Sequence, residues 1–308
     1  MTRVGAIDCG TNTIKLLIAD LDTTTGEEHV LSREVRIVRL GQGVDRTGRL
    51  ADEAVARTLA AVDEYAALLD EHRVDALRFC ATSASRDASN AAEFRAAVRD
   101  RLGVEPEVLS GDEEAALSYD GATRSLRSVT ELSRPFLVVD IGGGSTELVL
   151  GDGEVEAARS LDIGSVRLTE RLMPSDPPAA AEVSAATTAI DEALDTLPGH
   201  GVEPARAGTV IGVAGTVTTV AALLKGLDHW DRSAIHHATF PVGDVHALTE
   251  RLLAMTTAER VALHVPEGRA DVIAAGALVL DRVLRRTGVP SLLVSDADIL
   301  DGIAWSRA

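Results

Sequence analysis

Two ten-residue stretches of similar sequence decide the fold. Residues 7–16 read IDCGTNTIKL and residues 139–148 read VDIGGGSTEL. They align without a gap, so that an aspartate, a glycine, a hydroxyl residue and a leucine recur at the same relative positions. In each copy a glycine-rich polar segment separates two apolar runs, which is the pattern of a β-hairpin. The offset of 132 residues is the size of a domain rather than of a solenoid repeat, so the sequence predicts two copies of one α/β domain with a cleft between them.

The elements expected around the two hairpins are strands that alternate with amphipathic helices. The first copy has expected strands at 4–7, 14–19, 35–40 and 76–81 and expected helices at 51–71, 91–102 and 111–127. The second has expected strands at 136–140, 147–150, 155–161, 209–213 and 291–294 and expected helices at 165–172, 179–197, 216–224, 244–254 and 269–286. We therefore expect a first domain at 1–125, with 296–308 packing back on it, and a second domain at 126–295.

Composition limits the class of protein. A chain of 308 residues with 45% hydrophobic and 25% charged residues is an ordinary globular protein of about two domains. A net charge of −18 argues against a nucleic-acid partner, which would need a basic surface. No apolar run is long enough to span a membrane, and because the apolar run at 4–7 follows the first residue so soon, we expect no signal peptide. Cys9 and Cys80 lie in apolar runs and are expected to be reduced core residues of a cytoplasmic protein.

The two hairpin turns have the composition of anion-binding loops. Their glycines allow positive φ and close backbone approach, and successive N–H groups can then point into one concavity. The first turn offers Thr11 and Asn12 as additional donors, and the second offers Ser145 beside Gly143 and Gly144. Asp8 and Asp140, at the ends of the preceding strands, have the chemistry that Mg²⁺ prefers. A plain β-turn is the alternative for either copy alone.

The two copies differ in charge at one position, because Lys15 of the first hairpin aligns with Glu147 of the second. A cation suits phosphate and an anion suits a metal ion. We therefore expect the first hairpin to bind phosphate and the second to hold Mg²⁺.

Three further segments carry candidate residues. Gly215 and Thr216 follow a strand and open a helix, where free N–H groups bind anions, although Thr216 is also an ordinary N-cap residue. Arg86 follows the strand at 76–81, and there it is either a phosphate ligand or an ordinary surface arginine. Glu113 and Glu114 open the helix at 111–127, where acids are favoured by the helix dipole and where one of them could deprotonate a water.

The ordered set of motifs resembles the exopolyphosphatase and guanosine pentaphosphate phosphatase family, also called Ppx/GppA. The segments that carry the resemblance are residues 8–12, 81–86, 110–115, 140–148, 164–167, 212–216, 269–271 and 294–296. The resemblance implies a duplicated actin-like, ribonuclease-H-like fold, dependence on Mg²⁺ with Mn²⁺ as a substitute, and release of terminal phosphate. It also implies that Glu114 activates water, that Asp140 and Glu147 are metal-site carboxylates, and that the protein is a homodimer.

The expected activity is therefore that of an Mg²⁺-dependent exopolyphosphatase of the short, two-domain form. Hydrolysis of the 5′-phosphate of pppGpp is the nearest alternative, because the chemistry is the same. An ATP-using kinase or ATPase of the actin-like fold would need an adenosine pocket that the sequence does not identify. A non-enzymatic regulator that binds polyphosphate or an alarmone would have no need for Glu114 or the metal-site carboxylates.

Overall fold

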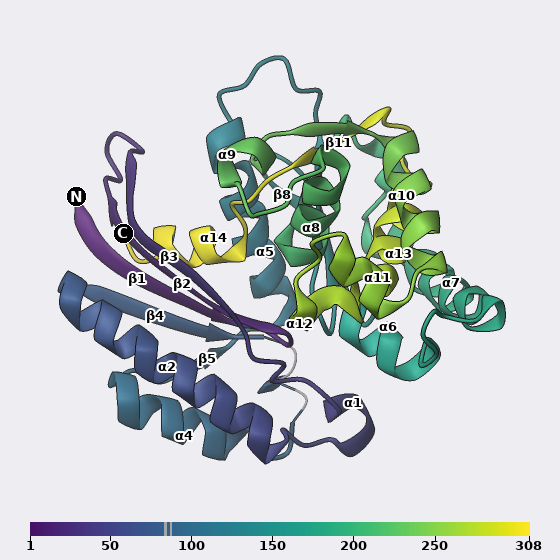
Figure 1. Ribbon diagram of the computed structural model, residues 1–308. Helices are drawn as coiled ribbons and strands as arrows, with labels where there is room; N and C mark the ends of the chain where they lie inside the picture. The colour runs from purple at the N-terminus through teal and green to yellow at the C-terminus, as the bar shows by residue number, and fades with distance from the viewer. Residues whose placement is uncertain (83–84, 87) are drawn as a thin grey trace. The chain divides into compact units, whose positions relative to one another are not determined.

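The computed structural model describes residues 1–82, 85–86 and 88–308, which form two compact units. Unit 1 contains Met1–Gly121 and Ile299–Ala308, and unit 2 contains Ala122–Asp298 (Figure 1). The domain boundaries predicted after residues 125 and 295 lie within a few residues of these breaks. Ser83 and Ala84, which belong to the motif at 81–86, lie outside the described residues.

Unit 1 is built on a five-stranded sheet in the order β3-β2-β1-β4-β5. β1 is antiparallel to β2 and parallel to β4, β3 is antiparallel to β2, and β5 is parallel to β4. The strands are β1 Thr2–Cys9, β2 Thr13–Leu21, β3 Glu28–Ile37, β4 Ala76–Ala81 and β5 Glu107–Val108. The helices are α1 Val44–Thr47, α2 Asp52–His72, α4 Ala91–Leu102, α5 Gly111–Thr123, which runs to the boundary with unit 2, and α14 Ile299–Trp305.

Both faces of the first sheet are covered, which explains why its central strands are apolar throughout. Helices α2 and α4 cover one face and α14 covers the other (Figure 1). In β1, Ile7 and Cys9 belong to the core under α2 and α4, and Val4 and Ala6 belong to the core under α14. Gly302 of α14 lies so close to α5 that a Cβ on it would be 2.0 Å from the Leu117 carbonyl oxygen. The C-terminal helix therefore closes the second face of this sheet.

Unit 2 is built on a six-stranded sheet in the order β10-β11-β9-β6-β7-β8. The strands are β6 Phe136–Ile141, β7 Thr146–Asp152, β8 Glu154–Leu161, β9 Thr209–Val213, β10 Thr239–Pro241 and β11 Ser291–Val294. The α-helices are α6 Ser165–Leu172, α7 Ala180–Leu194, α8 Ala214–Lys225, α9 Arg232–Ile235, α10 Val242–Ala254, α11 Thr257–Ala262, α12 Glu267–Ala270 and α13 Ile273–Leu284. Short 3₁₀ turns are found at Arg124–Leu126, Leu197–His200 and Pro204–Arg206.

The two sheets repeat one topology. β6, β7, β8, β9 and β11 of unit 2 follow the same order and the same strand directions as β1, β2, β3, β4 and β5 of unit 1, and β10 is an added antiparallel edge strand. The prediction of a duplicated α/β fold of the actin-like, ribonuclease-H-like class is therefore confirmed.

Two predicted elements differ most from the structure, and one buried helix was not expected. The third strand, expected at 35–40, is β3 at Glu28–Ile37, and its first half is an exposed edge that is held by backbone pairing and lacks hydrophobic alternation. The helix expected at 269–286 is divided, because α12 ends at Ala270 and α13 begins at Ile273. The unexpected helix is α14 at Ile299–Trp305, all of whose residues are buried.

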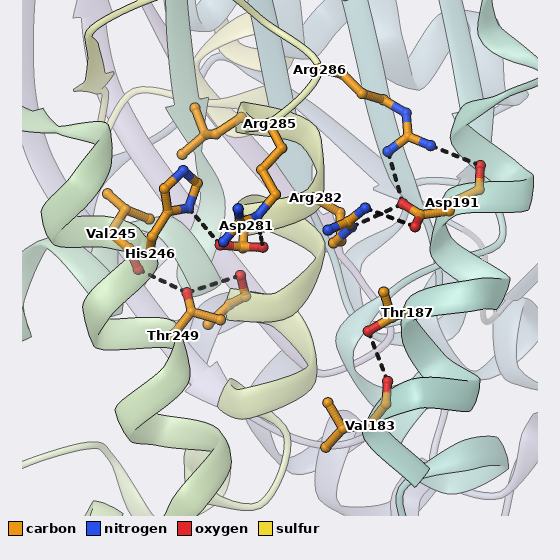
Figure 2. A network of polar contacts seen from close by, with 12 residues as sticks. Val183, Thr187, Asp191, Val245, His246, Thr249, Asp281, Arg282, Arg285 and Arg286 are labelled. Carbon is orange, nitrogen blue, oxygen red and sulfur yellow. Dashed lines mark hydrogen bonds and ion pairs between the residues drawn. The ribbon is translucent and has the colours of Figure 1, made fainter. Parts of the chain in front are cut away.

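A polar network joins three helices of unit 2 (Figure 2). The carboxylate of Asp191 in α7 accepts two hydrogen bonds from Arg282 of α13, at 2.9 and 2.8 Å, and one from Arg286 at 2.8 Å. Asp281 of α13 is contacted by His246 of α10 and by Arg285. Burial tends to raise the pKa of Asp191, but the arginine hydrogen bonds outweigh it and hold the pKa below its ordinary value.

We expect the Asp191→Asn substitution to lower the free energy of unfolding by about 1–2 kcal/mol at pH 7, because it removes charge-assisted bonds to two arginines. A carboxyl whose pKa is depressed in the folded state stabilises the fold above its unfolded pKa and loses that contribution as the pH falls. The difference from the wild type should therefore shrink below about pH 4. Urea unfolding at several pH values measures it. Asp195→Asn is the control, since Asp195 is 72% exposed and makes one bond to Arg286.

Among the described residues, no helix combines the length and the apolar character that crossing a membrane requires.

Candidate active site

The charged residues of each hairpin are direct cross-strand neighbours. In unit 1, Asp8 of β1 is paired in register with Lys15 of β2, and in unit 2, Asp140 of β6 is paired with Glu147 of β7. Residues directly opposite each other in an antiparallel pair place their side chains on the same face of the sheet. The alignment of Lys15 with Glu147 in the sequence thus corresponds to the same place in two equivalent hairpins.

The two pairs have opposite electrostatic character. Lys15 Nζ lies 3.4 Å from Asp8 Oδ2, and both side chains are largely buried, so the first pair is close to neutral. Asp140 and Glu147 are 6% and 2% exposed and bring two carboxylates to one place, where Ser160 donates a 2.7 Å hydrogen bond to Glu147 Oε1. Two neighbouring buried carboxylates repel each other unless a cation or protons neutralise them.

This arrangement fits Mg²⁺ in unit 2. The described part of the chain brings no three histidine, cysteine, aspartate or glutamate side chains together as a ready-made metal cage. Mg²⁺ does not need one, because it keeps several waters and binds one or two protein carboxylates together with phosphate oxygens. Asp140 and Glu147 supply that number of carboxylates, whereas Asp8 is already paired with a lysine.

The turn of the second hairpin is docked on the first residues of α6. The carbonyl oxygen of Gly142 accepts from Ser165 N at 2.9 Å, and that of Gly143 accepts from Val166 N at 2.9 Å. The Gly144 carbonyl accepts from Gly164 N at 3.2 Å. A Cβ on Gly164 would lie 2.4 Å from the backbone of Gly143 and Gly144, so only glycine permits this contact.

The direction of these carbonyls fixes the direction of the N–H groups. In a trans peptide the C=O and the next residue's N–H point to opposite sides. Because the carbonyls of residues 142–144 point toward α6, the N–H groups of Gly143, Gly144 and Ser145 point away from it. Consecutive N–H groups with a common direction form an anion-binding nest.

The first hairpin turn is held in the same way by a different segment. The Asn12 carbonyl accepts from the backbone N–H groups of Val38 and Arg39, at 3.0 and 2.9 Å, and the Thr11 carbonyl accepts from Gly41 N at 2.8 Å. The N–H groups of Asn12 and Thr13 therefore point away from residues 38–41. Residues 38–41 perform this role because the chain leaves the sheet after β3 ends at Ile37.

The first glycine of each turn does not adopt the left-handed backbone conformation that glycine favours. Neither Gly10 nor Gly142 has a positive φ, so that part of the expectation is wrong. A Cβ on Gly142 would lie 3.1 Å from the Ser145 carbonyl oxygen, and a Cβ on Gly10 would lie 3.4 Å from that of Thr13. The tight closure of the second turn therefore favours glycine at 142, whereas the space at Gly10 is that of an ordinary contact.

The third loop differs from its prediction at the start of the helix. α8 begins at Ala214, which has φ 65°, so Gly215 and Thr216 lie in the first turn and Thr216 is not the N-cap residue. Thr216 is 5% exposed and packs on Gly276 of α13, where a Cβ would lie 2.6 Å from its methyl carbon. The same Cβ would lie 3.2 Å from Ser165, so Gly276 lets the starts of α6 and α8 approach each other.

Arg269 lies over the third loop. Its Nη1 donates to the Gly215 carbonyl at 2.9 Å and to Thr219 Oγ1 at 2.7 Å, and burial lowers the pKa of Arg269 to about 10. A Cβ on Gly215 would lie 2.3 Å from this guanidinium. These contacts show that Arg269 holds the loop.

The two glutamates at the start of α5 have different surroundings. Glu113 caps the helix, because its carboxylate accepts from Ser110 N at 2.9 Å and from Ser110 Oγ at 2.8 Å. These hydrogen bonds hold the pKa of Glu113 below its ordinary value. Glu114 is 7% exposed, and its Oε2 lies 3.6 Å from Nη1 of Arg86. Arg86 Nη1 also donates to the Leu109 carbonyl at 2.8 Å.

The structure thus groups the predicted residues within each unit. Unit 1 pairs Arg86 with Glu114 and Asp8 with Lys15, next to Thr11 and Asn12 in the first turn. Unit 2 places Asp140 and Glu147 at the turn of Gly143, Gly144 and Ser145 and brings Thr216 close to Ser165.

The residues that hold these loops were not assigned from the sequence. They are 38–41, Gly164, Arg167, Arg269 and Gly276, although 164–167 and 269–271 were noticed as motifs.

The family to which the chain belongs follows from a match over almost its whole length. The model of the Ppx/GppA phosphatase family matches residues 18–306. The chain belongs to the Ppx/GppA phosphatase family. The resemblance inferred from the motifs is therefore confirmed, and the duplicated fold is that of the family.

Individual Ppx/GppA relatives are similar along their whole length. Exopolyphosphatase 2 of Mycobacterium tuberculosis is 49% identical over 324 aligned positions, which cover 100% of this chain and 99% of the relative. The crystal structure of an exopolyphosphatase-like protein is 43% identical with a TM-score of 0.94 and covers 99% of this chain and 97% of that one. The PPX-GPPA enzyme of Aquifex aeolicus is 32% identical with a TM-score of 0.83, with 99% of each chain covered.

Proposed function

We propose that this protein is an exopolyphosphatase that releases terminal phosphate from inorganic polyphosphate. Full-length similarity to a relative that bears that name supports the activity. The observation that carries the chemistry is the pairing of two buried carboxylates, Asp140 and Glu147, beside a turn whose N–H groups share one direction. Those two features together suit a phosphate that is bound through a metal ion.

The reaction is attack of water on the terminal phosphorus. The P–O–P anhydride bond breaks, and the products are orthophosphate and a chain shortened by one phosphate. Glu114 accepts the proton of the attacking water, and it is suited to that role because Glu113 is engaged as the helix cap. Phosphoryl transfer otherwise depends on positioning and on neutralising charge.

Charge neutralisation is divided among several groups. Phosphate oxygens are bound by two cations, Lys15 and Arg86, and by the N–H groups of Asn12, Gly143, Gly144 and Ser145. Gly215 and Thr216 contribute from the start of α8. Asp140 and Glu147 would hold Mg²⁺, or Mn²⁺ in its place, with a smaller contribution from Asp8. A bound divalent ion would supply positive charge to offset the negative charge of the phosphate oxygens.

The test is a comparison of substrates. Phosphate release from polyphosphate, pppGpp and ATP is measured side by side, with Mg²⁺ and with EDTA. We expect polyphosphate to be hydrolysed with the highest kcat/KM and EDTA to abolish turnover. A higher kcat/KM for pppGpp would replace the proposal with pppGpp 5′-phosphohydrolase activity, and binding without turnover would favour a regulator. Sedimentation equilibrium tests the homodimer that the family resemblance implies.

We expect Arg86→Ala to raise the KM for polyphosphate by about tenfold or more, because a charge-assisted hydrogen bond to phosphate contributes about 1.5–3 kcal/mol. Lys15→Ala should raise KM in the same direction. Initial rates over a range of polyphosphate concentrations measure both. Arg99→Ala is the control, since Arg99 is an exposed arginine of α4 in the same unit. An unchanged KM in both variants would contradict the assignment of these two side chains to phosphate.

A further inference from the structure

The turn of residues 142–145 is held by one charged side chain in addition to the backbone of α6. Arg167 is the third residue of α6, and its Nε donates a 2.8 Å hydrogen bond to the Gly144 carbonyl oxygen. The backbone N–H of Arg167 donates to the Gly143 carbonyl at 3.1 Å. One residue therefore contacts two consecutive peptide groups of the turn.

The hydrogen bond from Arg167 to the Gly144 carbonyl affects the N–H group of Ser145, which would donate to phosphate. The Gly144 carbonyl and the Ser145 N–H belong to the same peptide group and point in opposite directions. A cation that fixes the carbonyl therefore also fixes the N–H. Hydrogen bonding to the carbonyl polarises the peptide and makes its N–H a stronger donor.

The side chain of Arg167 is largely shielded from water. It is 13% exposed, so water competes weakly for the hydrogen bond. Its Nη2 also lies 3.6 Å from Asp162 Oδ1, and because that aspartate is 76% exposed, water screens this ion pair.

We infer that Arg167 is a positioning residue for phosphate binding, which acts from the rear of the turn by orienting and polarising the Gly144–Ser145 peptide. The inference rests on the proposed phosphate-binding role of residues 142–145. It assigns no contact between Arg167 and phosphate, so its effect passes through the backbone of the turn.

The test uses binding of inorganic phosphate, which does not depend on turnover. Phosphate is titrated into the ¹⁵N-labelled full-length protein, and the amide signals of Gly143, Gly144 and Ser145 are followed by NMR. We expect phosphate to shift these amides in the wild type and its Kd to rise about tenfold in Arg167→Ala, equivalent to about 1.4 kcal/mol. The KM for polyphosphate should rise by a similar factor, with kcat changed less.

Two matched variants separate positioning from general effects. Arg171→Ala removes the same charge one turn further along α6, on an exposed side chain, and should leave the phosphate Kd within twofold of the wild type. Arg167→Lys retains the charge without the planar Nε–H and should recover part of the lost affinity. If Arg167→Ala does not fold, the comparison of Arg167→Lys with Arg171→Ala still decides, because only the former should weaken phosphate binding.

The outcomes distinguish this inference from the proposed function. If phosphate shifts none of the three amides in the wild type, the proposed phosphate site itself is wrong. If phosphate binds the wild type, and folded Arg167→Ala binds it within twofold as tightly, the positioning role is overturned. An equal loss in Arg171→Ala would also overturn it, because the effect would then be long-range charge.

Discussion

Glu114→Gln is expected to lower kcat for phosphate release by about 10²–10⁴-fold while polyphosphate binding and folding are retained. The amide keeps the shape of the side chain but cannot accept a proton from water. Glu114 is buried and lies beside Arg86, so the substitution changes one charge in a defined place. The measurement is single-turnover phosphate release, together with the Kd for polyphosphate and a circular dichroism spectrum.

Glu113→Gln is the matched control for this experiment. Glu113 is the adjacent residue of the same helical turn, but its carboxylate is used to cap α5 through Ser110. Its loss should weaken the start of the helix and leave most of the activity. If Glu114→Gln kept more than about a tenth of the wild-type rate and Glu113→Gln did not, the roles of the two glutamates would be exchanged.

Glu147→Ala is expected to shift the Mg²⁺ activation curve to at least about tenfold higher concentration, or to abolish activity, with the fold retained. Mg²⁺ uses few protein ligands, so loss of one of two carboxylates removes much of the protein's share of the binding energy. In this variant Asp140, the cross-strand partner of Glu147, is the one carboxylate of the pair that is left to bind the ion. Phosphate release is measured as Mg²⁺ is varied at saturating polyphosphate.

Asp8→Ala is the control, because Asp8 occupies the equivalent position in the other hairpin. Its partner is Lys15 at 3.4 Å, and a lysine so close to the carboxylate opposes a metal ion. We therefore expect a smaller shift of the Mg²⁺ curve and an effect mainly on KM. An equal or larger shift for Asp8→Ala would mean that both hairpins hold the ion, and the division between a phosphate hairpin and a metal hairpin would be wrong.

The duplicated fold could be predicted from the sequence because its signal is local. In residues 7–16 and 139–148, apolar runs flank a polar turn, and the short hairpins that form there need no information from distant segments. The charge of each side chain is likewise known directly from the sequence. The exchange of Lys15 for Glu147 already indicated that the two hairpins differ, and the pairing in register places the two residues at equivalent positions.

Segments held by distant partners could not be predicted in this way. The first half of β3 has no hydrophobic alternation, because an edge strand is specified by backbone pairing with β2. Helix α14 is buried against α5 and the first sheet. Its formation therefore depends more on these distant segments than on its neighbours in the sequence. Short buried helices of this kind depend on tertiary packing for their stability.

The sequence by itself determined the types of residue that the site contains: the carboxylates, the cations, the glycine turns and the two glutamates at one helix start. Only the tertiary structure decided how these groups are oriented. Gly164 and the first three residues of α6 turn the carbonyls of 142–144 to one side and so aim the N–H groups to the other. A peptide group's direction depends on its hydrogen-bond partners, and here those partners lie about twenty residues away in the chain, where no local pattern reveals them.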